Sequence, residues 1–169
     1  MAANPFLHRQ DIARRVNELA AQIAEDYRGR RLLLLAPLGA QLLLDDLGDA
    51  LPLPHERDVL ELEPYRAGEA ARLRCQPVRS PRRQDVLLVD NVVDTGLSLG
   101  FLCREIEAQR PRSLAALAFL DRPHRRLLDD LPLRYVGFVV PDALFAGYGL
   151  TQQPELRESP HLYALGAEV

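Results

Sequence analysis

Apolar residues follow two patterns along this chain, one typical of helices and one typical of buried strands. From Ile12 to Ile23 they recur at helical spacing, which predicts an amphipathic helix over residues 9–27 that ends at Gly29. The sequence RLLLLA at residues 31–36 is a continuous apolar run, short enough to be a strand buried on both faces. A helix followed by a buried strand therefore opens the predicted fold.

The same alternation continues to residue 140. Helices are expected over residues 41–51 and 97–110, and strands over residues 58–63, 86–90, 113–120 and 134–140. Buried strands that alternate with helices indicate a mostly parallel sheet with crossover helices. We therefore predict an α/β fold, and the length of 169 residues predicts a single domain over residues 1–169.

The segment 63–84, EPYRAGEAARLRCQPVRSPRRQ, interrupts this alternation. It holds three prolines, six arginines and two glutamates, in a chain whose net charge is −3. A loop of this length in a compact domain is usually functional or disordered. The segment is either a mobile flap whose arginines meet an anionic ligand, or a solvated connector or irregular hairpin. Its composition favours neither alternative.

Composition and charge narrow the class of protein. The net charge of −3 gives no overall attraction to nucleic acid or to an anionic membrane surface, so neither partner is expected. The two cysteines form no disulfide framework, and no run approaches the ~18 apolar residues of a membrane span, which together predict a cytoplasmic protein. All 21 basic residues are arginine, which excludes chemistry that depends on a lysine, such as a Schiff base.

Polar side chains stand at the carboxyl end of the strand predicted over residues 86–90, in the sequence VLLVDNVVDTGLSL. Ligands of open parallel sheets bind beyond the carboxyl ends of the strands, so these side chains are candidates for a binding site. Asp90 and Asn91 can accept hydrogen bonds from vicinal hydroxyl groups, such as those of a ribose.

The turn over residues 94–98, DTGLS, leads into the next predicted helix. Backbone N–H groups at a helix N-terminus attract phosphate, the hydroxyls of Thr95 and Ser98 can add donors, and Gly96 permits close backbone approach. The alternative is a helix N-cap by Asp94 or Thr95 with nothing bound. Because that alternative leaves the preceding carboxylate and amide unexplained, the whole pattern favours a sugar-phosphate site.

This stretch resembles the phosphoribosyl-diphosphate (PRPP) signature of the type I phosphoribosyltransferases, in which a strand ends in two acidic residues before a short phosphate-binding loop. The sequences LAFLDRPHRR and YVGFVVPDALFAGYGLTQQPELR further resemble the purine-binding segments of hypoxanthine and hypoxanthine-guanine phosphoribosyltransferases. The resemblance covers residues 12–165 in matching order. It implies a type I phosphoribosyltransferase-like fold, with a central, mostly parallel sheet flanked by helices, a small hood and a mobile flap.

The resemblance also implies a role for each residue at a matching position. Asp94 is the candidate catalytic base near purine N7, and Asp90 is the candidate ligand of Mg²⁺. The ribose and 5′-phosphate of PRPP are assigned to Asp90, Asn91, Thr95, Gly96, Leu97 and Ser98. The diphosphate is assigned to Leu38, Gly39, Tyr65 and Arg157, with Tyr65 on the flap. The purine is assigned to Arg122, Leu144, Phe145 and Thr151, with Arg122 donating to a 6-oxo group.

The chain departs from the family pattern at several of these positions. Asn91 stands in place of the second acidic residue, Arg122 in place of a lysine, Thr151 in place of an aspartate and Leu144 in place of an aromatic residue, while Asp90 replaces a glutamate common in this subfamily. Two carboxylates and one stacking ring are therefore lost. If Asn91 bonds the ribose hydroxyls, an aspartate in its place is expected to raise turnover, because it adds negative charge beside the positively charged transition state.

The resemblance implies a purine salvage enzyme that transfers the 5-phosphoribosyl group from PRPP to a 6-oxopurine, with Mg²⁺ as cofactor. Hypoxanthine is the expected base and guanine a further candidate, giving IMP or GMP and diphosphate. The lost carboxylates motivate the alternative, a catalytically weak or inactive sensor that binds PRPP or nucleotides on the same fold. Many members of the family form dimers or tetramers, which implies a homo-oligomer.

Two further groups of residues are expected to have structural roles. Arg125 and Arg126, followed by Asp129 and Asp130, are predicted to form a solvated charged turn. The four histidines and two cysteines show no metal-ligand spacing.

Overall fold

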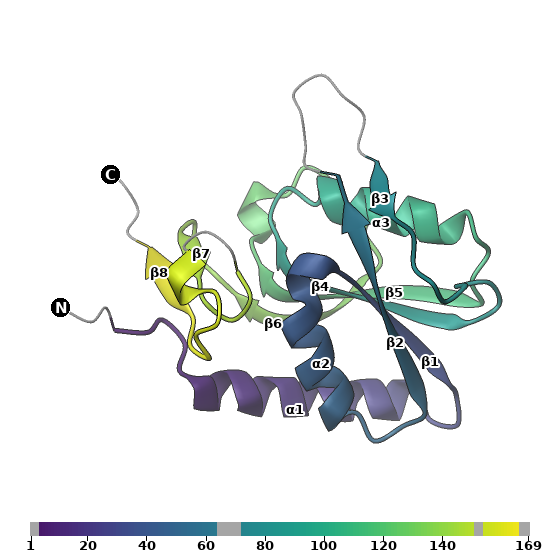
Figure 1. Cartoon of the computed structure of the whole chain (residues 1–169), viewed down its shortest axis with the longest axis horizontal. Coiled ribbons are helices and arrows are strands. Elements are labelled where there is room, and N and C mark those ends of the chain that lie inside the picture. Colours follow the sequence, from purple (N-terminus) through teal and green to yellow (C-terminus); the bar gives the residue numbers. More distant parts are fainter. Residues whose placement is uncertain (1–3, 64–71, 151–153, 166–169) are drawn as a thin grey trace.

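The computed structural model describes residues 4–63, 72–150 and 154–165, and its centre is a six-stranded sheet with the order β3-β2-β1-β4-β5-β6 (Figure 1). The strands are β1 (Leu32–Pro37), β2 (His55–Leu62), β3 (Leu73–Cys75), β4 (Asp85–Val93), β5 (Ser113–Asp121) and β6 (Leu133–Val139). Neighbouring strands are parallel, except that β3 is antiparallel to β2. The predicted α/β fold with a mostly parallel sheet is confirmed.

Helices cover both faces of this sheet. The helices α1 (Arg9–Asp26) and α2 (Gln41–Ala50) pack on one face, and α3 (Leu97–Glu107) packs on the other. Successive residues of β4 from Val86 to Val89 alternate between the two apolar cores. Burial of both faces explains why the strands read as continuous apolar runs. In the part of the chain that the structure describes, no helix is both long enough and apolar enough to span a membrane.

The strand order reverses between β1 and β4. From β1 the chain runs outward to β2 and β3, then crosses to β4 on the other side of β1 and continues to β5 and β6. At such a switch point the connections after two neighbouring parallel strands diverge and leave a crevice at the carboxyl edge of the sheet. The short helix η1 (Leu38–Ala40) after β1 and the loop after β4 flank this crevice.

The strand β4 is longer than predicted. It continues past Asp90, because Val92 and Val93 remain paired with Leu120 and Asp121 of β5. Asp90, predicted as the last residue of the strand, and Asn91, predicted just after it, therefore both lie within β4. Side chains of adjacent strand residues point to opposite faces, and this alternation decides what each polar group contacts.

The strand β3 lies inside the segment 63–84. It pairs with β2 at Glu61 and Leu62, so β2 and β3 form a short antiparallel hairpin with a register shift, in line with the irregular-hairpin alternative. The intervening residues 64–71, which include Tyr65, lie outside the described residues. The mobile flap stays a prediction.

The chain after β6 forms a second, two-stranded sheet at one end of the molecule (Figure 1). Its strands β7 (Leu144–Ala146) and β8 (Tyr163–Leu165) are antiparallel. We name the described residues of 144–165 the hood. The hood is joined to the main sheet layer through the hydroxyl of Tyr148, which donates to the carboxylate of Asp46 in α2 over 2.7 Å.

The start of the chain completes the hood. Leu7 and Leu162 form an isolated antiparallel bridge, and the ring centroids of Phe6 and Phe145 are 5.2 Å apart. Leu162 and Phe145 are buried. The hood therefore packs on the apolar core beneath α1 and α2, which includes Phe145 and Leu162 and has Leu7 packed against it.

Candidate active site

The turn after β1 lies against the end of β4. The side-chain amide of Asn91 donates a hydrogen bond to the carbonyl oxygen of Gly39 over 2.8 Å. Asn91 is only 6% exposed, and its Oδ1 atom is buried without a hydrogen-bond partner. Leu38 is exposed, and a Cβ atom built on Gly39 would meet no atom within 4 Å, so this turn presents an open backbone surface. One side chain thus joins the segments predicted for ribose and for diphosphate.

Asp90 points away from this contact, toward α3. It lines a cavity of about 80 Å³ together with residues of the turn that follows β4: Val92, Val93, Asp94, Thr95, Gly96, Ser98 and Leu99. Burial raises the pKa of Asp90 to about 6, although the backbone N–H groups of Asn91 and Val92 act to lower it. The carboxylate is therefore mostly ionised at neutral pH and is protonated a little below it.

The turn after β4 leads into α3 without a side chain that caps the N-cap residue. That residue is Gly96, with a φ of 82°. The N–H of Leu97 donates to Oγ1 of Thr95 over 3.4 Å, and the other N–H groups of the first helical turn are available to an anion, so we name residues 94–98 the anion-binding turn. A Cβ atom on Gly96 would lie 2.9 Å from Cδ1 of Leu131, so packing as well as backbone conformation favours glycine here. The structure brings Thr95, Leu97 and Ser98 together in this turn, as a phosphate site requires.

Two arginines hold the carboxylate of Asp94. Nε of Arg125 donates to Oδ1 of Asp94 over 2.6 Å, and Nη1 of Arg122 lies 3.8 Å from the same oxygen. Arg125 also contacts Asp142 over 3.3 Å, and its hydrogen bond to Asp94 raises the pKa of its guanidinium. Arg125 was expected in a solvated charged turn. Its side chain is 43% exposed, as a solvated turn requires, and its two ion pairs are with carboxylates outside that turn.

Arg126, unlike Arg125, is mostly removed from solvent. Its guanidinium pairs with the carboxylate of Asp121, and both side chains are mostly buried. The next residue, Leu127, donates its backbone N–H to the carbonyl oxygen of Thr95 over 2.9 Å. The segment after β5 therefore packs against the anion-binding turn and holds its backbone in place. The sequence signal was the clustering of arginines directly after a buried strand, where a solvated turn was assumed.

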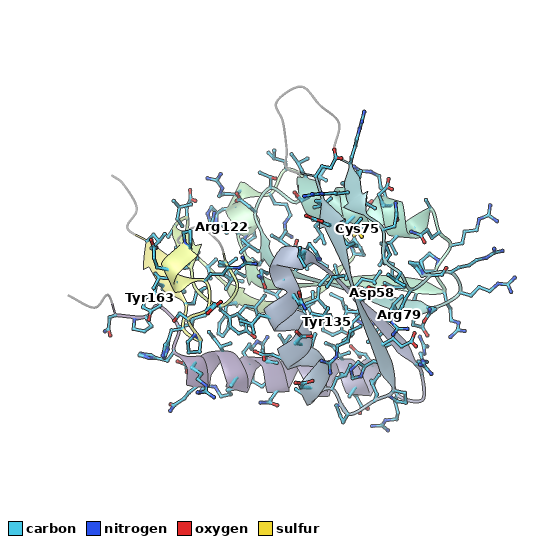
Figure 2. The ribbon with its side chains drawn as sticks, viewed as in Figure 1. Asp58, Cys75, Arg79, Arg122, Tyr135 and Tyr163 are labelled. Carbon is cyan, nitrogen blue, oxygen red and sulfur yellow. The ribbon has the colours of Figure 1, made fainter. Side chains whose placement is uncertain are left out.

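Arg122 joins the main sheet layer to the hood (Figure 2). It is buried, its guanidinium donates to the carbonyl oxygen of Ala143, and its Cζ lies 5.6 Å from the ring centroid of Phe145. Its Nε has no hydrogen-bond partner. Leu144 is 53% exposed whereas Phe145 is 2% exposed, so only Leu144 offers its side chain to a ligand. Thr151 lies outside the described residues.

Arg157 lies on the hood, in an exposed turn. Its carbonyl oxygen accepts the backbone N–H of Gly149 over 2.9 Å. A Cβ atom on Gly149 would lie 3.5 Å from the carbonyl oxygen of Gly39 and 3.6 Å from Nδ2 of Asn91. The hood therefore brings the Arg157 turn close to the turn after β1, as predicted residues of one diphosphate site require.

Two carboxylates, those of Asp90 and Asp94, line the small cavity after β4. No group of three or more histidine, cysteine, aspartate or glutamate side chains that could hold a metal occurs among residues 4–63, 72–150 and 154–165. Mg²⁺ does not need such a group, because proteins usually bind it through one or two carboxylates with substrate phosphates and water. The carboxylate of Asp90, beside the anion-binding turn, is suitable for that role.

A wider groove lies elsewhere, between α1, α2 and the hood. It has a volume of about 540 Å³ and is lined by Arg9, Ile12, Ala13, Val16, Asn17, Leu42, Asp46, Asp49, Ala50, Tyr148, Glu158 and Pro160. None of the predicted site residues lines it. We place the candidate site at the smaller crevice, because the carboxylates, the anion-binding turn and the buried arginine meet there.

Known proteins share this sequence and fold. The phosphoribosyl transferase domain model matches residues 4–138. The hypoxanthine-guanine phosphoribosyltransferase of Mycobacterium tuberculosis is 32% identical over 175 residues, which cover 97% of this chain and 86% of the relative. The hypoxanthine phosphoribosyltransferase of Salmonella typhimurium is 31% identical over 159 residues, 90% of this chain and 89% of the relative. The hypoxanthine phosphoribosyltransferase of Trypanosoma cruzi, a variant solved as a ternary substrates complex, superposes with a TM-score of 0.89 at 27% identity and covers 98% of this chain and 96% of that chain.

Proposed function

The chain belongs to the phosphoribosyl transferase family, and from this premise we propose that it transfers the 5-phosphoribosyl group of PRPP to a 6-oxopurine and releases diphosphate. The observation that best supports this proposal is that three parts of the site lie together where the strand order reverses. The Asn91 amide bonds the turn at Gly39, the anion-binding turn follows on β4, and Asp94 lies 3.8 Å from Arg122. A sugar phosphate and a base fit side by side at such a site.

In this reaction the C1–O bond of PRPP breaks, positive charge develops on the ribose, and N9 of the purine bonds C1. The purine loses a proton from N7, and we assign Asp94 to accept it. Arg125 occupies Oδ1 of Asp94 at 2.6 Å, which leaves Oδ2 to face the base. Arg125 thereby orients the carboxylate and forms a hydrogen bond with only one of its two oxygens.

The phosphate groups of PRPP are assigned to backbone N–H groups and arginine. The turn from Thr95 to Ser98 holds the 5′-phosphate, and the Leu38–Gly39 turn with Arg157 holds the diphosphate. Donors that are fixed before the reaction stabilise the charge that develops on the leaving group. Bound by Asp90 and by oxygens of PRPP, Mg²⁺ would neutralise part of the same charge.

The preference for a 6-oxo group rests on Arg122. A guanidinium only donates hydrogen bonds, so it pairs with an oxygen at purine C6 and opposes the amino group of adenine. The Ala143 carbonyl and the Phe145 ring hold this guanidinium beside the hood. The exposed Leu144 side chain covers the purine where the family pattern has an aromatic ring. The roles of Tyr65 and Thr151 rest on the resemblance alone.

Turnover assays with hypoxanthine, guanine, xanthine or adenine, each with PRPP and Mg²⁺, test this function. We expect IMP from hypoxanthine, and turnover of adenine alone would overturn the base assignment. Asp94→Asn should lower kcat by about 10²- to 10⁴-fold with a smaller change in PRPP affinity. Binding of PRPP without turnover of any base would favour the sensor alternative, which none of the present observations supports.

Three properties extend the proposal and rest on the family resemblance. The segment 63–84 closes over bound PRPP and excludes water. The chain acts as a homo-oligomer, and it works in the cytoplasm. Its proposed partners are the small molecules PRPP and purine base, with no nucleic acid or membrane involved.

A further inference from the structure

Asn91 makes a contact that an ionised aspartate cannot make. Its Nδ2 donates to the carbonyl oxygen of Gly39 over 2.8 Å, in a place where the side chain is 6% exposed. A carbonyl oxygen only accepts hydrogen bonds, and so do both oxygens of an ionised carboxylate. The amide is therefore a requirement of this turn as the structure has it.

The second polar atom of the same side chain is unused. Oδ1 of Asn91 is buried and has no hydrogen-bond partner. Buried polar atoms in folded proteins nearly always have a partner, so an unpartnered one indicates a missing ligand or water. The hood covers this place, since a Cβ atom on Gly149 would lie 3.6 Å from Nδ2 of Asn91.

We propose that Asn91 is a positioning residue that couples the ribose and diphosphate parts of the PRPP site. Its Nδ2 fixes the Gly39 turn for the diphosphate, and its Oδ1 accepts a hydrogen bond from a ribose hydroxyl. This inference rests on the proposed function. It reverses the expectation that an aspartate at position 91 raises turnover, because that carboxylate would face the carbonyl oxygen of Gly39.

The decisive variant is Asn91→Asp, measured at pH 8 as a ratio to the wild type. We expect kcat/KM for PRPP to fall by at least about tenfold, because the carboxylate repels the Gly39 carbonyl and the hydrogen bond that Asn91 donates over 2.8 Å is lost.

Asn17→Asp is the matched control. Asn17 also donates its Nδ2 to a backbone carbonyl, that of Ala13 over 2.8 Å, but it lies exposed on α1. We expect the ratio of this variant to the wild type to stay near one at pH 8. An Asn91→Asp ratio of one or more would overturn the inference.

Calorimetry with inorganic diphosphate and with PRPP tests the coupling without turnover. Asn91→Ala removes both bonds, so the affinity for PRPP should fall by a larger factor than the affinity for diphosphate. Equal factors would refute the bond to the ribose. If the wild type binds both ligands and turns over no base, the proposed function fails. The calorimetry still shows whether Asn91 couples the ribose and diphosphate parts of the site. Circular dichroism confirms that each variant is folded.

Discussion

At the scale of single residues, a shift of one position along β4 changes which part of the site a side chain faces. Asp90 and Asn91 follow each other in β4, yet Asp90 faces the anion-binding turn and Asn91 faces the turn after β1. The sequence predicts that both lie at a site, because polar residues interrupt an apolar run. It does not predict their separate partners, because the register of the strand decides which face each residue meets.

Asp90 lowers the stability of the protein at neutral pH. Burial raises its pKa from 3.8 to about 6, so the folded state binds a proton that the unfolded state has already lost. The stability that this proton contributes is complete below the unfolded value and is lost as the pH rises through about 6. Asp90→Asn should therefore raise the free energy of unfolding at pH 7.5 by roughly 1–3 kcal/mol.

Denaturant titrations of Asp90→Asn at pH 7.5 and at pH 4 check this prediction. The gain should be much smaller at pH 4, where the wild-type carboxyl is protonated in the folded protein. The same variant should lose affinity for Mg²⁺ with PRPP, since function and stability conflict at this position. An equal gain at both pH values would show that the carboxylate is not strained by burial.

At the scale of elements, long periodic segments were predictable and short ones were not. The helix predicted over residues 9–27 matches α1, which spans Arg9–Asp26, and the strand predicted over 31–36 matches β1 within one residue. The strands β3, β7 and β8 have three residues each, too few for a pattern to emerge, and they depend on pairing partners elsewhere in the chain. The ion pairs of Arg125 and Arg126 were missed for the same reason, because they form between separate segments.

The start of α3 depends on a single glycine. Gly96→Ala forces a φ of 82° on a residue with a Cβ atom, which would also approach Cδ1 of Leu131 to 2.9 Å. We expect unfolding to become easier by about 1–2 kcal/mol. Affinity for PRPP should fall as well, by about tenfold, because the N–H groups of the turn move from the phosphate.

Gly29→Ala is the control for that prediction. Gly29 has a φ of 74° with no atom within 4 Å of a built Cβ, and it lies after α1, away from the site. It should lose similar stability and keep the wild-type affinity for PRPP in calorimetry. If both variants bind PRPP equally well, the turn at Gly96 does not hold the phosphate.

At the scale of the whole molecule, the site is divided between the main sheet layer and the hood. The two share an apolar core that includes Tyr148, and the hydroxyl of Tyr148 also donates to Asp46 over 2.7 Å. Tyr148→Phe removes this bond and keeps the packing of the ring. We expect a loss of about 0.5–1.5 kcal/mol in the free energy of unfolding. Steady-state kinetics should show a raised KM for the purine, because the hood carries part of the base site.

Tyr135→Phe separates this effect from a loss of stability alone. Tyr135 makes the same kind of bond, to Asp26 over 2.6 Å, but it joins β6 to the end of α1. This variant should lose comparable stability with an unchanged KM for the purine. Equal KM values for the two variants would indicate that the position of the hood does not affect base binding.

The strand β3 gives this molecule one natural place for a chemical label. Cys75 is exposed on β3 (Figure 2), whereas Cys103 is buried in α3, and burial raises the pKa of its thiol to about 12. Because the thiolate is the reactive form, a maleimide dye should attach to Cys75 and leave Cys103 unmodified. The chain contains no lysine, so dyes that react with amines find no side chain to modify. A single fluorophore on the edge strand, within the segment predicted as a flap, can therefore report on ligand binding in the unmutated protein.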